Sequence, residues 1–98
     1  MSATRLSDLG RLSLNQMTTN LLNMDEAIAA CSAHGIPWIG AWRHKLDQDV
    51  PAIRRRMESA GLKVSSLCRG GMFPALTPAE RKQRIEDNFR AIDDAAEL

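Results

Sequence analysis

The expected fold rests on two short apolar runs, each ending in an arginine: Ile36-Pro-Trp-Ile-Gly-Ala-Trp-Arg-His44 and Leu62-Lys-Val-Ser-Ser-Leu-Cys-Arg-Gly-Gly-Met-Phe73. The apolar part of each run is too short for a surface helix and is typical of a buried strand. We therefore predict strands over Ile36–Trp42 and Leu62–Cys68.

The two runs belong to a repeat. When Gly35 is aligned with Gly61, Trp42 falls on Cys68, and the arginine that follows each of them coincides. Both glycines lie where the left-handed cap of a preceding helix is expected. The sequence therefore predicts successive units in which an arginine follows the strand.

Helical patterns precede and follow these strands. Capping-box patterns predict helix starts at Asn23 and at Thr77, and either Gln48 or Asp49 can open a helix between them. The last helix is expected to run almost to Leu98, because apolar residues recur at helical spacing along it. These residues are Ile85, Phe89, Ile92 and Ala96.

An alternation of apolar and polar residues predicts a first strand over Leu12–Thr18. The order strand, helix, strand, helix, strand, helix indicates an α/β fold with a parallel sheet of right-handed crossover units. A three-stranded parallel sheet with helices on one face leaves its edges and opposite face uncovered. We therefore expect an incomplete fold, with a fourth strand due about one residue after Leu98.

Length and composition predict one small domain over residues 11–98, after a flexible N-terminus over residues 1–10. A formal charge of +1 gives no overall field for nucleic acid or an anionic membrane, so neither is an expected partner. The chain has neither a signal-peptide pattern nor an apolar run of membrane-spanning length, and we expect a cytoplasmic protein. Cys31 and Cys68 are expected to be buried thiols, with a disulfide as the alternative.

Three segments together resemble the opening units of the sugar phosphate isomerase/epimerase family: Leu12-Ser-Leu-Asn-Gln-Met-Thr-Thr, Gly35-Ile-Pro-Trp-Ile-Gly-Ala-Trp-Arg and Val64-Ser-Ser-Leu-Cys-Arg-Gly-Gly-Met-Phe73. The resemblance implies the xylose-isomerase-like TIM barrel, and covers the first three βα units of a (β/α)8 barrel of ~250 residues. A complete member would isomerise or epimerise a small sugar or polyol derivative.

The resemblance also implies a divalent metal in the complete protein. Family members hold it with carboxylates and a histidine from later strands, where it polarises a carbonyl or enediolate oxygen. Those strands have no counterpart in this sequence, so we expect no metal ligand here and leave the catalytic residues unassigned.

The candidate substrate-binding residues follow the predicted second and third strands, at the end where barrel enzymes build their sites. Arg43 and Arg69 are expected either to bind a phosphate, carboxylate or sugar hydroxyl, or to pair with a nearby acid or remain solvated. Trp42 can form a wall against a sugar ring or pack in the core. His44 can assist proton transfer or lie exposed in a loop.

The remaining candidates lie in the glycine-rich loop. Gly70 and Gly71 can form an anion-binding nest or a plain turn, and Phe73 is expected beside the substrate. Two further groups are expected to be structural. They are core methionines at Met17, Met57 and Met72, and solvated arginines at Arg54, Arg55 and Arg56.

Two other functions stay open. The chain can be a non-catalytic fragment or interaction module that pairs through its exposed sheet edges with another copy or with the rest of a barrel. An endonuclease of the same fold is less favoured, because the chain is close to neutral and has no basic, aromatic-rich patch.

Overall fold

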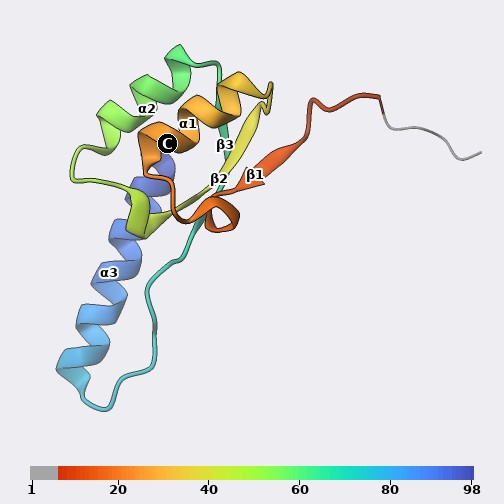
Figure 1. Cartoon of the computed structure of the whole chain (residues 1–98). Helices are drawn as coiled ribbons and strands as arrows, with labels where there is room; N and C mark the ends of the chain where they lie inside the picture. The colour runs from red at the N-terminus through yellow and green to blue at the C-terminus, as the bar shows by residue number, and fades with distance from the viewer. Residues whose placement is uncertain (1–6) are drawn as a thin grey trace, which may run out of the picture.

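The computed structural model describes residues 7–98, so part of the predicted flexible terminus, residues 1–6, lies outside the described residues. The described chain forms a three-stranded parallel sheet in the order β1-β2-β3 (Figure 1). The α/β class and the parallel βα repeats are thereby confirmed. The elements are β1 (Ser13–Asn15), the 3-10 helix η1 (Gln16–Thr19), α1 (Met24–Ala33), β2 (Trp38–Trp42), the 3-10 helix η2 (Arg43–Lys45), α2 (Val50–Ser59), β3 (Lys63–Cys68) and α3 (Pro78–Glu97).

All three helices begin where the capping signals predict. The Asn23 side chain accepts a hydrogen bond from the Glu26 N–H at 2.8 Å, and the Glu26 carboxylate accepts one from the Asn23 N–H at 3.0 Å. Asp49, rather than Gln48, caps α2. Thr77 caps α3 through its hydroxyl, which accepts from a first-turn N–H at 3.2 Å. These bonds satisfy N–H groups that have no partner within the helix.

The ends of α1 and α2 also match the prediction. Gly35 and Gly61 have φ values of 66° and 68°, in the left-handed region that glycine occupies without steric cost. Each glycine turns the chain from a helix toward the next strand. α3 ends at Glu97, close to the predicted Leu98.

The first strand is shorter than predicted, because its second half turns into η1. The side chain of Asn15 accepts a hydrogen bond from the Met17 N–H at 3.1 Å, which offers the backbone a local partner and bends it out of the sheet. Gln16 is fully buried there, and its Oε1 accepts a hydrogen bond from the Trp42 N–H at 2.8 Å. The prediction of a strand to Thr18 is therefore wrong beyond Asn15.

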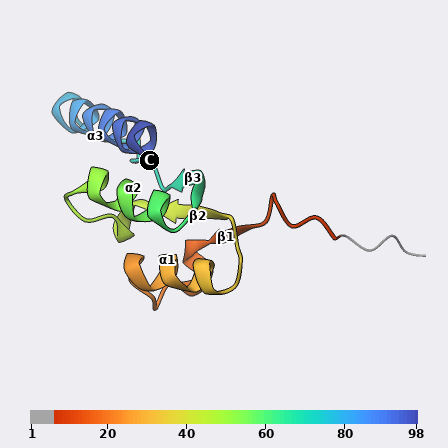
Figure 2. The same ribbon diagram turned by 90° about the horizontal axis from the view of Figure 1, so that it is seen from above.

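The core lies between the sheet and the first two helices. Ile39 of β2 packs against residues of α1 and α2, with Leu14 of β1 and Val64 of β3 beside it. Figure 1 shows both helices on one side of the strands, and Figure 2 shows α2 lying between α1 and α3. The buried core cluster consists of Met24, Ala27, Ile28, Cys31, Ile39, Ile53, Met57 and Leu62.

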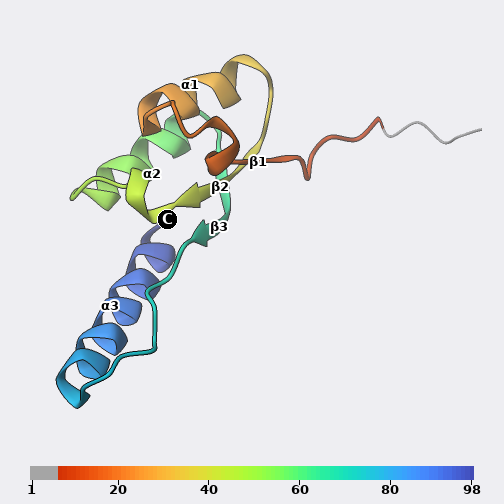
Figure 3. The same ribbon diagram turned by 60° about the horizontal axis from the view of Figure 1, so that its bottom comes forward.

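α3 differs from the other helices in its packing. Its N-terminal half projects away from the sheet (Figure 3), and Ala91 is its one buried residue. The apolar residues Ile85, Phe89 and Ile92 are 47%, 61% and 63% exposed. Nothing in the described part of the chain covers this face of α3.

Two expectations about sulfur-containing residues are partly wrong. Met57 is buried in the core, but Met17 and Met72 are exposed, because they lie on the turn of η1 and in the loop before α3. Both cysteines are free thiols. Cys31 is buried, and burial raises its pKa, whereas Cys68 at the end of β3 is only partly buried.

The pairing of β2 with β3 changes register partway along. Ile39 pairs with Val64, whereas Gly40 pairs with Ser66, so that Ser65 is an additional residue on β3. This is the arrangement of a β-bulge. Within the part of the chain that the structure describes, no helix combines the length and apolarity needed to cross a bilayer.

Candidate functional site

A shallow pocket of about 230 Å³ lies on the sheet face that the helices do not cover. Its residues alternate along the strands with Leu14, Ile39 and Val64, which face the core. None of the lining residues carries a formal charge, so the surface is neutral and polar. They are Ser13, Asn15, Gly40, Trp42, Ser65, Ser66 and Cys68.

Two hydrogen bonds connect strands across this pocket. The hydroxyls of Ser13 and Ser65 are 2.7 Å apart, and the indole Nε1–H of Trp42 donates to Asn15 Oδ1 at 2.8 Å. The second bond holds the tryptophan ring beside β1. Asn15 and Ser66 are both exposed, so the amide nitrogen of Asn15 and the hydroxyl of Ser66 are open to solvent.

Gly40 keeps the middle of the pocket open. A Cβ at this position would lie 3.3 Å from Ser66 Oγ and 3.7 Å from the Asn15 Cα. A larger residue would therefore press on the strands at both sides and cover the polar groups between them.

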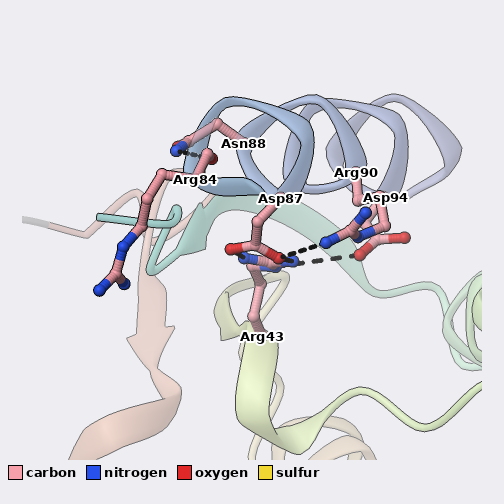
Figure 4. Close-up of polar contacts among 6 residues, drawn as sticks. All are labelled: Arg43, Arg84, Asp87, Asn88, Arg90 and Asp94. Atoms are coloured by element: carbon pink, nitrogen blue, oxygen red, sulfur yellow. Dashed lines mark hydrogen bonds and ion pairs between the residues drawn. The ribbon is translucent and has the colours of Figure 1, made fainter. Parts of the chain in front are cut away.

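Arg43 lies at the end of β2 but is directed toward α3 (Figure 4). Its Nη1 and Nη2 donate to the two carboxylate oxygens of Asp87 at 3.2 and 3.0 Å, and its Nε lies 4.0 Å from Asp94. The hydrogen bond from Arg43 is the main cause that lowers the pKa of Asp87, and the same bond raises the pKa of the arginine. Arg43 is expected either to bind a ligand, or to pair with an acid or remain solvated. In the structure it pairs with Asp87 and Asp94.

His44 lies at the edge of the same region. Its ring packs edge-on against Trp42, with ring centroids 6.0 Å apart and an interplanar angle of 70°. Its Nε2 is 3.0 Å from Asn20 Oδ1, which holds the imidazole in place. Trp42, the last residue of β2, and His44, in η2, are thus brought together.

The glycine-rich loop packs against α3. A Cβ at Gly71 would overlap the carboxylate of Asp87, and one at Gly70 would lie 3.3 Å from Asn88 Oδ1. Neither glycine has a positive φ, so the pair does not form the alternating right- and left-handed turn of an anion nest. Close approach to α3 explains why glycine occurs here.

The other two predicted site residues are exposed and follow β3. Arg69 forms no ion pair within the described residues 7–98, and Phe73 is 63% exposed. The two repeat arginines therefore have different environments, since Arg43 is paired with acids and Arg69 is solvated. A role in substrate binding stays a prediction for both.

Sequence reasoning missed the residues that line most of the pocket. Period-two alternation is the signal that places Asn15 on this face. Ser65 and Ser66 are consecutive and share the face only because of the β-bulge, for which the sequence has no clear signal. Asp87, the partner of Arg43, is 44 residues away in sequence and has no local signal.

No group of three or more histidine, cysteine, aspartate or glutamate side chains comes together within residues 7–98. The metal implied by the family resemblance would need ligands from elsewhere, and we derive no catalytic step from it.

No protein-family model and no curated protein matches the sequence. Among solved structures, the chain is similar to the crystal structure of protein SMc04130 from Sinorhizobium meliloti 1021, with 38% sequence identity and a TM-score of 0.83. The similarity covers 92% of this chain and 34% of that one. The chain therefore spans about a third of the length of the structure it matches.

Proposed function

We propose that this chain forms the first three βα units of a TIM barrel in a sugar phosphate isomerase/epimerase-like protein. In this proposal the complete protein acts on a small sugar or polyol derivative, and residues 11–98 supply one wall of its substrate pocket. The observation that carries the proposal is the neutral polar pocket on the uncovered sheet face, with Trp42 and Asn15 at the carboxyl ends of the strands. Barrel enzymes bind substrates at that end.

The uncovered surfaces support the barrel. A further βα unit beside β3 would cover both the free edge of that strand and the exposed residues Ile85, Phe89 and Ile92 of α3. SMc04130 has the length for further units, because the present chain matches only 34% of it.

A chimera tests the barrel. Residues 11–98 replace the matching third of SMc04130, and we expect a soluble protein with one cooperative thermal transition. SMc04130 itself is the control. A chimera that aggregates, or that melts in two separate steps, would contradict the barrel.

The proposed reaction is tested on the same chimera. Isomerases and epimerases of this type exchange a carbon-bound proton beside a carbonyl, so incubation with ketoses in D2O is expected to introduce deuterium at that carbon. Mass spectrometry measures the incorporation. If a folded chimera incorporates no deuterium into any of a panel of ketoses, the enzyme proposal fails while the barrel stands.

The exposed face of α3 favours a second candidate, a module that self-associates. Ile85, Phe89 and Ile92 form an apolar stripe that another copy of the chain could cover. Light scattering over a range of concentrations distinguishes the two. Self-association that Phe89→Glu abolishes and Phe73→Glu retains supports the module, whereas a monomer at all concentrations excludes it.

A further inference from the structure

We propose that two copies of this chain associate through α3, with the two helices side by side and pointing in the same direction. Such pairing rests on the self-association proposed above as the second candidate function, and it adds the orientation and the register of the partner. The barrel is a separate proposal, which the chimera tests.

α3 has two opposite sides. The side toward the rest of the chain carries the buried Ala91 and also Asp87, which pairs with an arginine at the end of β2 (Figure 4). Successive residues of an α-helix are about 100° apart around its axis, so Ile85, Phe89 and Ile92 lie on the opposite side. All three are exposed. The apolar side of α3 therefore points away from the rest of the described chain.

The apolar side has the spacing of a coiled-coil seam. Its exposed residues follow one another at steps of three, four, three and four, and such steps let the side chains of one helix enter the gaps between those of another. We call these residues the α3 seam. They are Lys82, Ile85, Phe89, Ile92 and Ala96. Because the seam covers only two heptads, the contact is small and the dimer is expected to be weak.

Charged residues beside the seam favour parallel helices. Arg81 borders the seam on one side, and Glu86 and Asp93 border it on the other. Between parallel helices, the first side of one copy faces the second side of the other, which brings Arg81 beside Glu86 of the partner copy twice in each dimer. Antiparallel helices would instead place the two acidic sides together, where like charges repel. The charges beside the seam are thus complementary to those of a second copy in the parallel orientation.

Arg81 and Glu86 are both available for such a contact. Each is exposed, and neither forms an ion pair within residues 7–98. The guanidinium of Arg81 lies near the loop before α3, with its Nη1 3.5 Å from the Ala75 carbonyl oxygen. Contact with a second copy would therefore give both side chains an ionic partner without breaking an existing ion pair.

The position of the seam also allows a closed dimer. Because the seam lies opposite Asp87 and Ala91, the rest of each chain lies on the outer side of the helix pair. A two-fold axis along the pair then relates the copies, and each presents the same surface to the other. Both seams are covered in this arrangement, so association stops at the dimer.

Charge reversal tests the orientation. Sedimentation equilibrium of the 98-residue chain is expected to show monomers and dimers in equilibrium. Arg81→Glu and Glu86→Arg should each raise the dimer dissociation constant about two- to thirtyfold, because an exposed ion pair that occurs twice is replaced by repulsion. The double variant should restore the parent value. Arg55→Glu, on the exposed side of α2, changes the net charge as Arg81→Glu does and should have no effect.

The outcomes separate the parallel pair from self-association itself. Tighter association of Glu86→Arg than of the parent would indicate antiparallel helices, and no effect of either reversal would place the two charges outside the contact. Either result overturns the parallel pair, while the self-associating module stands. A chain that stays monomeric at every concentration overturns both and leaves the barrel to the chimera.

Cross-linking measures the register. In a chain that carries Cys68→Ser and Ala96→Cys, parallel helices bring the two introduced thiols together. Glutathione disulfide is expected to oxidise them to an intermolecular disulfide and to be reduced to two glutathione molecules. The buried Cys31 remains a thiol. Ser32→Cys in the same background, on the exposed surface of α1, is the control and should cross-link slowly. Equal rates for the two variants would contradict the parallel pair.

Discussion

Arg43, at the end of β2, and Asp87, in the middle of α3, form a two-pronged ion pair with N–O distances of 3.2 and 3.0 Å. The pair joins elements that are 44 residues apart in sequence. Ala91 is the one buried residue of α3, and ion pairs are prominent among the contacts of this helix with the rest of the fold. Arg54 and Glu97 form a second such contact at 2.9 Å.

Asp87→Asn is expected to loosen α3. The substitution keeps the shape of the side chain but removes its charge, so the two-pronged contact with Arg43 is lost. Amide hydrogen exchange should become faster along Pro78–Glu97 and stay unchanged in α1. Glu86→Gln, which neutralises the neighbouring exposed acid, is the control. Equal effects of the two substitutions would show that the ion pair does not hold the helix.

The same ion pair predicts a dependence on pH. Its hydrogen bonds lower the pKa of Asp87 below the ordinary value of 3.8, so the stabilisation is present above that value and is lost as the pH falls through the lowered pKa. The free energy of unfolding of the parent chain should therefore exceed that of Asp87→Asn at neutral pH. This difference should shrink below about pH 4. Urea titrations of both proteins at several pH values measure the difference in the free energy of unfolding. A difference that stays constant at acidic pH would show that the ion pair of Asp87 with Arg43 is not its cause.

Gly71→Ala should act through Asp87. The added methyl group would overlap the Asp87 carboxylate, which must then move away from Arg43. We expect faster exchange in α3, as for Asp87→Asn, and little further effect when both substitutions are combined. Gly70→Ala is the matched control, since its methyl group would lie 3.3 Å from Asn88 Oδ1 and needs only a small adjustment. Additive effects of Gly71→Ala and Asp87→Asn would show that Gly71→Ala does not act through Asp87.

Ile53→Ala tests the core between the helices and the sheet. Ile53 is fully buried, and its truncation should lower the free energy of unfolding by about 2–5 kcal/mol. Ile53→Val should lower the free energy of unfolding by about 0.5–1.5 kcal/mol, and it provides the measurement if the alanine variant does not fold. Ile92→Ala, on the exposed face of α3, should cost less than about 0.5 kcal/mol. Urea unfolding followed by circular dichroism compares them, and similar losses at Ile53 and Ile92 would place the core elsewhere.

Local signals predicted the ends of the helices best. Asn23, Asp49 and Thr77 each cap a helix through a side chain only a few residues from its partner, and Gly35 and Gly61 need only a backbone conformation. Such contacts depend on neighbouring residues in the sequence, so a pattern is enough to find them.

The contacts that form the candidate site join residues far apart in the sequence, so no local pattern could predict them. Asp87 meets Arg43 only after the sheet and α3 have been placed, and Asn15 meets Trp42 only across two strands. The shortening of the first strand has a similar cause, since buried Gln16 finds its partner in the Trp42 N–H. The role of a strand-end arginine therefore could not be decided from its position in the repeat.

The extra residue at Ser65 adds a second serine to the pocket face of β3 without changing the direction in which the following residues point. With it, Leu67 pairs with Ala41 and Cys68 with Trp42. A deletion of one residue between Val64 and Leu67 would remove the bulge, keep Leu67 paired with Ala41, and leave a single serine on the pocket face. In homologous chains, the number of residues in this strand would then indicate whether one or two neighbouring residues face the pocket before the position of Leu67, even where the residue types have diverged.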